Sequence, residues 1–302
     1  MKARLCILFL FLISFSECWM QIADCGLLKS EIRNPKSEIS RNEAIKLFTD
    51  ANEKYLQASK SIVAKDNREA EQKLKDAALQ YEMILLSGFK HGQIYYNLGN
   101  TYYRQGELGK AILNYRRAQR FIPRNADLET NLKLVKNSTE DKELSGETPV
   151  VIRRIFFWFF LLNHNELIIL AVSLYVVLMT LLFFLIILKY SWLKRMIIGF
   201  SVSLFIAVVS IGIKTYVERG ISHGVIVTSK CQVRYGPGDE YEPKFEIHDG
   251  AECIIEGEKG GWYRVYVYVG VKQDTGTKTG SEEKVSKEIR KGWLQKKNVD
   301  II

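Results

Sequence analysis

Histidine is scarce in this chain of 302 residues, and its four histidines lie far apart, at positions 91, 164, 223 and 248. They show neither the spacing of metal ligands nor a partnership between a nucleophile and a base. The sequence also lacks a glycine-rich phosphate loop, a Gly-x-Ser-x-Gly turn and a pair of carboxylates on a recognisable catalytic scaffold. We therefore expect no catalytic residue, no metal site and no cofactor, and we interpret the protein as a non-enzyme.

Cysteine is also rare, with five residues. Cys231 and Cys253 fall in predicted strands, where apolar core residues would sit. In an exported protein they would either form a disulfide or remain two buried thiols, and a redox-active pair is a third hypothesis. Cys18 and Cys25 suggest a lipoprotein signal, but each follows an acidic residue where a small one is expected, so lipidation stays open.

Two long stretches contain no charged residue. Residues 167–188 form a run of 22, of which 17 are Leu, Ile, Val or Phe, and residues 196–213 form a run of 18. Each run has about the length that a helix needs to cross the roughly 30 Å of hydrocarbon in a bilayer. Two buried core helices would need other apolar segments to cover them, and none is long enough. The sequence therefore predicts a transmembrane helical hairpin with a short turn at 189–195.

The N-terminus has the pattern of a secretory signal peptide over residues 1–20. Lys2 and Arg4 precede an apolar run that ends in small residues, and an uncleaved anchor helix is the alternative. Residues 21–42 show no apolar period, which favours a flexible leader. A cleaved signal places the next segment outside the cytoplasm, and the hairpin returns the C-terminus to the same side. We therefore expect a bacterial inner (cytoplasmic) membrane protein with both soluble domains in the periplasm and residues 189–195 in the cytoplasm.

The formal net charge of the chain is +9 at pH 7. A nucleic-acid-binding protein would gather its basic residues on one face, with aromatic residues between them. In this sequence Lys and Arg are spread through every segment, so we expect no nucleic-acid partner.

Residues 43–137 show a helical pattern that contains one specific motif. The 34 residues from 92 to 125 carry large aromatic residues, a Leu-Gly pair, alanines and a proline at the offsets of a tetratricopeptide repeat. The small residues let two helices approach, the tyrosines fill the space around them, and the proline ends the second helix. The signature positions are Tyr95, Leu98, Gly99, Tyr102, Ala111, Tyr115, Ala118 and Pro123.

One repeat cannot bury its own apolar face, so neighbouring repeats are expected. Ala77, Tyr81 and Ile84 lie one period of 34 residues upstream of equivalent positions in the motif. The first helix of this upstream repeat is displaced by an inserted charged stretch near 59–71, which would lengthen a helix or form a loop. Downstream, residues 126–136 have one apolar face, which suits a cap helix. We predict about two repeats and a cap helix in this region.

The first helices of such repeats line a concave groove, where a partner would bind. Asparagine side chains offer both a donor and an acceptor to the backbone of an extended peptide. The alternative is that Asn97 and Asn131 only tie neighbouring helices together. The predicted groove residues are Gln93, Tyr96, Asn97, Asn100, Tyr103, Arg104 and Asn131.

Residues 138–154 are mostly polar and contain glycine and proline, which favours a linker. Residues 155–166 begin with IFFWFFLL directly after Arg153 and Arg154, and this segment is too short to span a bilayer. Aromatic residues beside a basic pair are typical of a segment that lies at the lipid headgroups. The alternative, a first span that begins earlier, would bury the carboxylate of Glu166 in hydrocarbon.

Residues 225–302 contain short alternating runs broken by glycine-rich turns, which predicts strands. This block resembles the bacterial SH3-type domain, an all-β small barrel that often binds peptides or cell-wall fragments. An inserted charged loop is expected between Val269 and Gly292, and it departs from that family, which usually has a short hairpin turn there. Tyr235 and Trp293 would line a groove or join the core, and we favour the core for Trp262. The shared marks are Val233, Arg234, Gly236, Pro237, Gly238, Gly250, Trp262, Tyr263, Val265, Gly292 and Trp293.

The parts follow one another as signal peptide, repeats, aromatic segment, two spans and SH3-type tail. With NLGNTYYRQGELGKAILNYRRA in its repeat, the chain resembles the BatE family, the tetratricopeptide membrane proteins of bacterial aerotolerance operons. The resemblance implies a periplasmic scaffold for oxidative-stress tolerance, with membrane partners that carry von Willebrand type A domains. The rival hypothesis is a peptidoglycan-binding anchor or sensor that acts through the SH3-type tail. We expect a multidomain protein with an α-helical tetratricopeptide domain, a transmembrane helical hairpin and an all-β SH3-like barrel.

Overall fold

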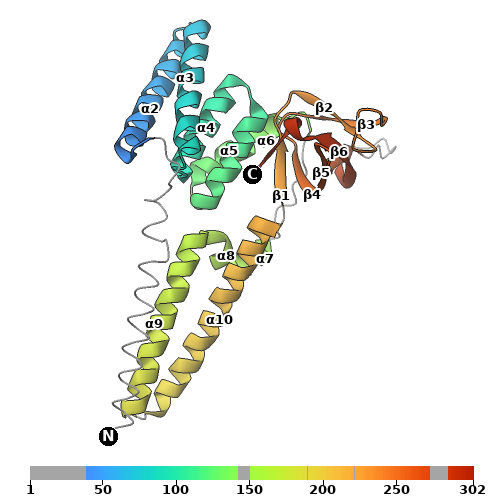
Figure 1. Cartoon of the computed structure of the whole chain (residues 1–302). Coiled ribbons are helices and arrows are strands. Elements are labelled where there is room, and N and C mark those ends of the chain that lie inside the picture. Colours follow the sequence, from blue (N-terminus) through green and yellow to red (C-terminus); the bar gives the residue numbers. More distant parts are fainter. Residues whose placement is uncertain (1–38, 142–149, 189, 221, 273–284) are drawn as a thin grey trace, which may run out of the picture.

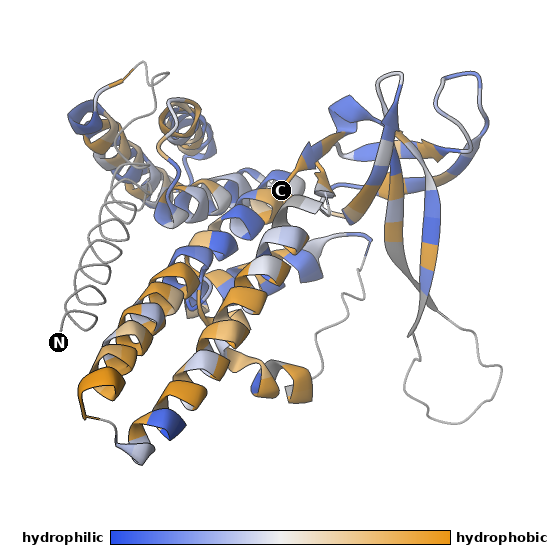
Figure 2. Cartoon of the chain, turned by 60° about the horizontal axis from the view of Figure 1, so that its bottom comes forward, coloured by the Kyte–Doolittle hydropathy of each residue, from blue (hydrophilic) through white to orange (hydrophobic). Residues whose placement is uncertain are grey.

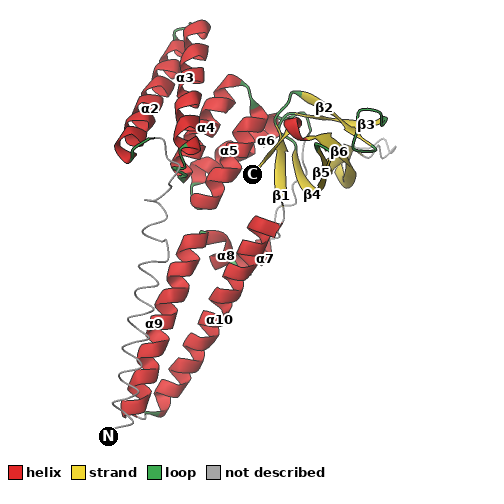
Figure 3. Ribbon diagram, in the orientation of Figure 1, coloured by secondary structure: helices red, strands yellow, loops and turns green. Residues whose placement is uncertain are grey.

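The computed structural model describes residues 39–141, 150–188, 190–220, 222–272 and 285–302 (Figure 1). The predicted signal peptide, most of the predicted leader, and Cys18 and Cys25 lie outside these residues. Within them the chain forms a helical repeat region, two long apolar helices and a curled antiparallel sheet (Figure 3). The repeat region and the sheet lie at the same end of the two long helices (Figure 1).

The repeat region is built from two helical hairpins and a last single helix. Its helices are α2 (Arg41–Val63), α3 (Asn67–Leu86), α4 (Gly92–Gln105), α5 (Leu108–Phe121) and α6 (Ala126–Ser138). The inserted stretch at 59–71 lengthens both helices of the first hairpin, because α2 has 23 residues and α3 has 20, whereas α4 and α5 have 14 each. The Asp66 side chain caps α3 by accepting from the Glu69 N–H, and Gly106 ends α4 with a left-handed φ of 82°.

Small residues between α4 and α5 explain why this hairpin packs closely. A Cβ atom at Gly99 would lie 2.7 Å from the ring of Tyr115, and Ala111 and Tyr115 are both fully buried. Tyr81 and Ile84 of α3 are buried in the equivalent way. The cap helix α6 adds three buried residues, Leu128, Leu132 and Val135. The predicted repeat and cap positions therefore share one hydrophobic core.

Two helices, α9 (His164–Leu188) and α10 (Ser191–Gly220), are long and apolar enough to cross a membrane. The candidate spans have 25 and 27 residues, which correspond to about 37 and 40 Å of helix. The two helices lie side by side, and their surfaces are predominantly apolar (Figure 2). Only 11% of the most apolar window of each helix is buried. The rest of the described chain therefore leaves most of this apolar surface uncovered.

Two short helices, α7 (Val150–Ile155) and α8 (Phe157–Leu161), precede α9. Helix α7 takes up the last five residues of the expected linker, 138–154, and ends at Ile155. The start of α9 carries a reciprocal capping box, because the Glu166 carboxylate accepts from the Asn163 N–H at 2.9 Å and the Asn163 side chain accepts from the Glu166 N–H at 2.8 Å. Glu166 is thus placed in the first turn of α9, where its side chain keeps 30% exposure.

The C-terminal part is one antiparallel sheet with the strand order β3-β2-β6-β5-β4-β1-β7. Its elements are β1 (Ser222–Ile226), β2 (Lys230–Arg234), β3 (Pro243–His248), β4 (Glu252–Lys259), β5 (Trp262–Lys272), β6 (Val285–Gln295), the 3-10 turn η1 (Lys296–Asn298) and β7 (Val299–Ile301). Trp262 is only 7% exposed, which confirms its expected core position.

The long hairpin of β5 and β6 replaces part of a stretch that was expected to be a loop. Pairing runs continuously from Trp262 opposite Gln295 to Lys272 opposite Val285. The expectation of a loop from Val269 to Gly292 is therefore wrong at both ends, because the β-branched residues there continue the ladder. Residues 273–284 lie outside the described part of the chain.

Cys231 and Cys253 are both buried, and neither forms a disulfide within the described residues. Burial raises the pKa of the Cys231 thiol to about 11. At neutral pH this thiol is protonated, and a protonated thiol is a poor nucleophile. Of the three interpretations of this pair, two buried thiols describe the structure.

The repeat region and the sheet pack against each other. Val225 of β1 is fully buried and belongs to the hydrophobic core of the repeat region. A Cβ atom at Gly109, at the start of α5, would lie only 2.1 Å from the Ile226 carbonyl oxygen. Glu252 of β4 pairs with Arg116 of α5 at 2.7 Å and with Lys136 of α6 at 3.2 Å. The repeat region and the sheet therefore pack into a single unit, which we call the soluble body. The sequence had predicted two separate domains.

Candidate functional site

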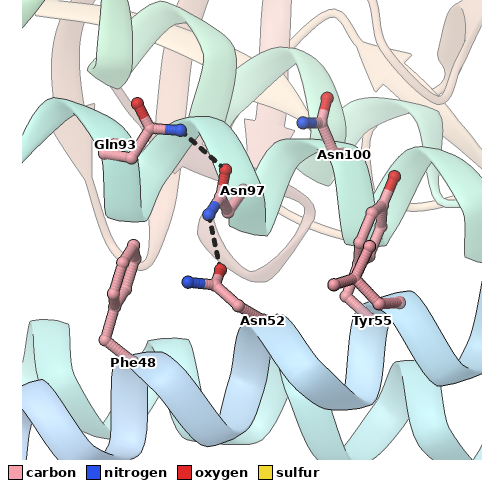
Figure 4. A pocket seen from close by; sticks show the side chains of 7 residues that line it. Phe48, Asn52, Tyr55, Gln93, Asn97 and Asn100 are labelled. Atoms are coloured by element: carbon pink, nitrogen blue, oxygen red, sulfur yellow. Dashed lines mark hydrogen bonds between the residues drawn. The ribbon is translucent and has the colours of Figure 1, made fainter.

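A pocket of about 340 Å³ opens between α2 and α4, the first helices of the two hairpins (Figure 4). We call it the groove, and it is lined by Phe48, Asn52, Tyr55, Leu56, Gln93, Asn97 and Asn100. The α2 wall carries two aromatic rings, one leucine and one amide, whereas the α4 wall carries three amides, and none of the lining residues is charged. Such a surface suits a polypeptide better than a strongly charged ligand.

The same three-residue hydrogen-bonding unit occurs in both hairpins. In the first unit, the Oδ1 atom of Asn52 accepts from the Tyr81 hydroxyl at 2.6 Å and from the Asn97 amide at 2.8 Å. The second unit has the same pattern, because the Oδ1 atom of Asn100 accepts from the Tyr115 hydroxyl at 2.7 Å and from the Asn131 amide at 3.0 Å. Each unit therefore joins a second helix to two successive first helices.

The spacing of these units shows how the insertion is accommodated. The tyrosines of the two units are 34 positions apart, and so are the amide donors Asn97 and Asn131. The central asparagines, Asn52 and Asn100, are 48 positions apart because the inserted residues lie between Asn52 and Tyr81. The longer first hairpin thus keeps the same side-chain geometry as the second.

The tyrosine hydroxyls fix which way the central amides point. Burial raises the pKa of both Tyr81 and Tyr115 above the usual value, so these hydroxyls remain protonated donors. Each hydroxyl must meet an acceptor, and the Oδ1 atom of the asparagine supplies it. Among the described residues, the Nδ2 groups of Asn52 and Asn100 donate to no protein atom. Both donors are available to a ligand in the groove.

One end of the groove carries an aromatic ring beneath a cation. The Nε atom of Arg104 donates to the Tyr55 hydroxyl at 2.7 Å, and its guanidinium lies 5.2 Å from the centre of the Tyr55 ring. Arg104 remains exposed. A ligand in the groove would therefore meet a positive charge at this end.

The structure brings three of the predicted groove residues, Gln93, Asn97 and Asn100, into the pocket lining. The other predicted residues lie beside it. Tyr96 accepts from Asn131 at 3.1 Å, and Tyr103 packs against the core. Asn97 and Asn131 do tie successive first helices together, as the alternative interpretation held.

Sequence reasoning missed the half of the groove that α2 supplies. Four lining residues come from this helix, namely Phe48, Asn52, Tyr55 and Leu56. The sequence contains a pattern that could have indicated these residues: an aromatic residue at Phe48, Asn52 four positions later, and Tyr55 three positions after that. The same pattern occurs in the second repeat, so Phe48 is equivalent in position to Tyr96, and Tyr55 is equivalent to Tyr103. A search restricted to the period of 34 residues could not find it.

A second pocket, of about 450 Å³, lies on the sheet and is lined by Lys230, Cys231, Gln232, Arg234, Asp239, Glu246, Trp262, Gln295, Lys297 and Asn298. Several of its polar groups already bind one another. Lys230 pairs with Glu246 at 2.6 Å, and Arg234 donates to the Asp239 carbonyl at 3.1 Å. This pocket is more polar than the groove, which suits a hydrated ligand.

Of the residues that carry the resemblance to an SH3-type domain, Arg234 and Trp262 line this second pocket. Val233 is buried, and a Cβ atom at Gly292 would lie 2.3 Å from its side chain. A Cβ atom at Gly236 would likewise lie 2.4 Å from the Tyr241 ring. Pro237 and Gly238 follow it in the connection between β2 and β3, and Trp293 pairs with Arg234 across the ladder. Tyr235 is 62% exposed and therefore does not join the core.

Residues 92–125 match the tetratricopeptide repeat family. The match covers α4, α5 and the turn to α6, which includes the α4 wall of the groove and every predicted signature position. No curated protein sequence matches the chain. A tetratricopeptide repeat is a protein-binding unit, so the match indicates a role in protein–protein interaction.

Proposed function

We propose that this protein is a membrane-anchored, non-catalytic scaffold that holds an extended segment of a partner protein in the groove. The observation that carries the proposal is the repeated Tyr–Asn–Asn unit, which turns the amide donors of Asn52 and Asn100 toward the groove. An extended peptide has unpaired carbonyl oxygens along its backbone, and each of them needs a donor when it is buried. Two donors at equivalent positions of successive repeats meet this need without regard to side-chain sequence.

The aromatic lining supplies the apolar part of the binding energy. Phe48 and Tyr55 lie on the wall opposite the asparagine amides of α4 (Figure 4). Side chains of an extended peptide point alternately to two sides, so one set would pack on these rings. Arg104 at one end favours an acidic residue or a free carboxylate in the partner.

The two long apolar helices support a membrane anchor, with α9 and α10 as the spans. In this proposal the chain resides in the bacterial inner membrane, and both soluble parts face the periplasm. Their position at one end of the hairpin supports a common side (Figure 1), and the signal-like N-terminus supports the periplasm. The order of parts, including the SH3-type tail, supports the resemblance to the BatE family, so membrane proteins with von Willebrand type A domains are the proposed partners.

The test removes the two amide donors without disturbing the hydrogen bonds that support them. Asn52→Asp with Asn100→Asp keeps an Oδ1 acceptor for each tyrosine and replaces each Nδ2 donor by an acceptor. Asn137→Asp, on an exposed position of α6, is the matched control. Crosslinking in intact cells, followed by purification from solubilised membranes, should recover type A domain proteins with the wild type and the control, and much less with the double variant. Equal recovery with the double variant at an unchanged Tm would contradict the proposal.

The rival function, a peptidoglycan anchor or sensor, has one observation in its favour, the polar pocket on the sheet. Purified full-length chain would be sedimented with isolated cell-wall sacculi. Retention that is lost in Lys297→Ala and kept in the groove double variant would favour the anchor. The full chain is needed because Val225 of the sheet is buried in the hydrophobic core of the repeats.

A further inference from the structure

The short helices α7 and α8 expose an unusual amount of apolar surface. Six of their residues and connecting positions are between 43% and 67% exposed, namely Val151, Ile152, Ile155, Phe156, Phe157 and Leu161. A contiguous apolar patch of this kind is rarely left in water, and it marks a contact with protein or lipid. In Figure 2 this segment projects beside the two long helices, coloured mostly as apolar.

Two hydrogen-bonded contacts fix the level of this segment along α10. The indole N–H of Trp158 donates to the Ser210 hydroxyl at 3.2 Å. The Lys214 ammonium donates to the carbonyl oxygens of Leu162 at 2.6 Å and Phe159 at 3.3 Å. Ser210 and Lys214 are one helical turn apart, about 6 Å. Helix α8 therefore lies across the last turns of the apolar part of α10.

Lys214 marks the place where hydrocarbon would end. It is the first charged residue after the uncharged run 196–213. Its ammonium group meets the carbonyl oxygens at the end of α8, which no longer have partners within that helix. Hydrogen bonds of this kind reduce the cost of removing an ammonium group and backbone carbonyls from water.

The other end of the segment is tied to the repeat region. The Asn163 amide donates to the Phe121 carbonyl at the end of α5 at 3.2 Å. Glu166, the partner of Asn163 in the capping box, also forms an ion pair with Arg124. The segment is thus attached to α10 on one side and to the last turn of α5, through the start of α9, on the other.

We propose that α7 and α8 lie in the plane of the membrane that α9 and α10 cross, with their exposed apolar residues in the boundary between acyl chains and headgroups. The lipid of that bilayer is the occupant of the patch, because the patch is continuous with the uncovered surface of the spans and lies at the level of Lys214. Exposed Arg154 on α7 meets the headgroup phosphates. This anchor fixes the height of the repeats, and hence of the groove, above the bilayer.

This inference rests on the proposed membrane-spanning hairpin. The fluorescence of individual tryptophans tests the hairpin and the in-plane anchor separately. Trp192 lies at the start of α10, at the far end of the hairpin from Trp158, whereas Trp262 and Trp293 lie in the sheet. Full-length protein would be reconstituted in vesicles of phosphatidylethanolamine and phosphatidylglycerol whose acyl chains are brominated near the headgroup. The emission of Trp158 is the difference between wild type and Trp158→Phe, and that of Trp192 is obtained from Trp192→Phe.

With Trp19 replaced by Phe in every variant, we expect brominated lipid to quench both Trp158 and Trp192 and to leave the remaining emission, from Trp262 and Trp293 of the sheet, unchanged. Quenching of Trp192 without quenching of Trp158 would overturn the in-plane anchor while the hairpin stands. No quenching of either residue would overturn the hairpin and the anchor together.

A second measurement avoids any dependence on Trp158. Phe157→Cys in the vesicles should resist a membrane-impermeant maleimide, whereas Leu134→Cys, at a position of α6 that is 48% exposed, should react. Equal labelling of the two cysteines, above the background of the parent chain, would place the patch in water or against a soluble partner and would contradict the proposal.

Discussion

Arg116 of α5 donates hydrogen bonds to both carboxylate oxygens of Glu252 in β4, from Nε to Oε1 at 2.7 Å and from Nη2 to Oε2 at 3.0 Å. The two residues are 136 positions apart. The Glu252 side chain is only 14% exposed, and Lys136 lies 3.2 Å from the same carboxylate. This cluster is the polar centre of the contact between the repeat region and the sheet, and the surrounding core is apolar.

Glu252→Gln should lower the free energy of unfolding by up to about 3–5 kcal/mol, because it leaves two half-buried cations without their counter-charge. Thermal or chemical unfolding of the detergent-solubilised chain measures the change. Glu71→Gln is the matched control, because its pair with Lys75 is more than half exposed on both sides. That control should leave the free energy of unfolding almost unchanged, because solvent screens an exposed ion pair. An equally small loss in Glu252→Gln would show that the cluster does not hold the two parts together.

Acid should weaken this contact in a defined direction. Burial raises the pKa of Glu252, but Arg116 and Lys136 outweigh it and hold the pKa below its usual value. A carboxylate with a lowered pKa stabilises the fold above the unfolded value of about 4.3, and this contribution is lost as pH falls through the folded pKa. The Tm difference between wild type and Glu252→Gln should therefore shrink below about pH 4. A difference that stays constant into acid would contradict this assignment.

Gly109→Ala should loosen the contact although alanine favours helix. The added Cβ would lie 2.1 Å from the Ile226 carbonyl oxygen and 2.2 Å from the Asp249 carboxylate. Backbone at such a distance has to move, so the loss exceeds the gain of about 1 kcal/mol in helix propensity. Gly257→Ala, where nothing lies within 4 Å, is the control. Faster proteolysis between the repeat region and the sheet in Gly109→Ala alone is the expected result.

Tyr81→Phe should affect both stability and binding, because the lost hydroxyl no longer orients the Asn52 amide. A lost hydrogen bond of this kind costs about 0.5–1.5 kcal/mol. Tyr115→Phe should behave in the same way in the second repeat. Tyr235→Phe, at a position 62% exposed, should change neither quantity. Partner capture at wild-type level in both Tyr81→Phe and Tyr115→Phe would show that amide orientation does not matter.

The sequence was sufficient for parts of the fold that depend on local spacing. Tyr95, Gly99 and Ala111 predicted the α4–α5 hairpin because helical packing repeats at fixed offsets. The uncharged runs predicted two long apolar helices because their lengths match a bilayer. The first hairpin was predicted only in outline, since the insertion moved Asn52 away from the period of 34 residues.

Contacts between distant segments were not predictable in the same way. Nothing in the local sequence around Arg116 indicates that its partner follows the second apolar helix, because ion pairs across domains leave no periodic signal. Val225 reads as an ordinary strand residue, yet it completes the core of the repeats. Trp262 was predicted to be buried, and it is 7% exposed.

The hairpin of α9 and α10 has a further consequence for how the soluble body stays closed. Glu166 attaches the start of α9 to the repeats, and Val225 joins their core a few residues after α10 ends. The repeat region is attached to α9 and the sheet to α10, and these two helices lie side by side. The repeat region and the sheet therefore have a high effective concentration relative to each other. The connection between α9 and α10 is shorter than the predicted turn 189–195, because α10 already begins at Ser191. Cutting the chain between Leu188 and Ser191 should leave the repeats and the sheet in contact for as long as the two spans stay paired. Separating the sheet from α10 should let the body open.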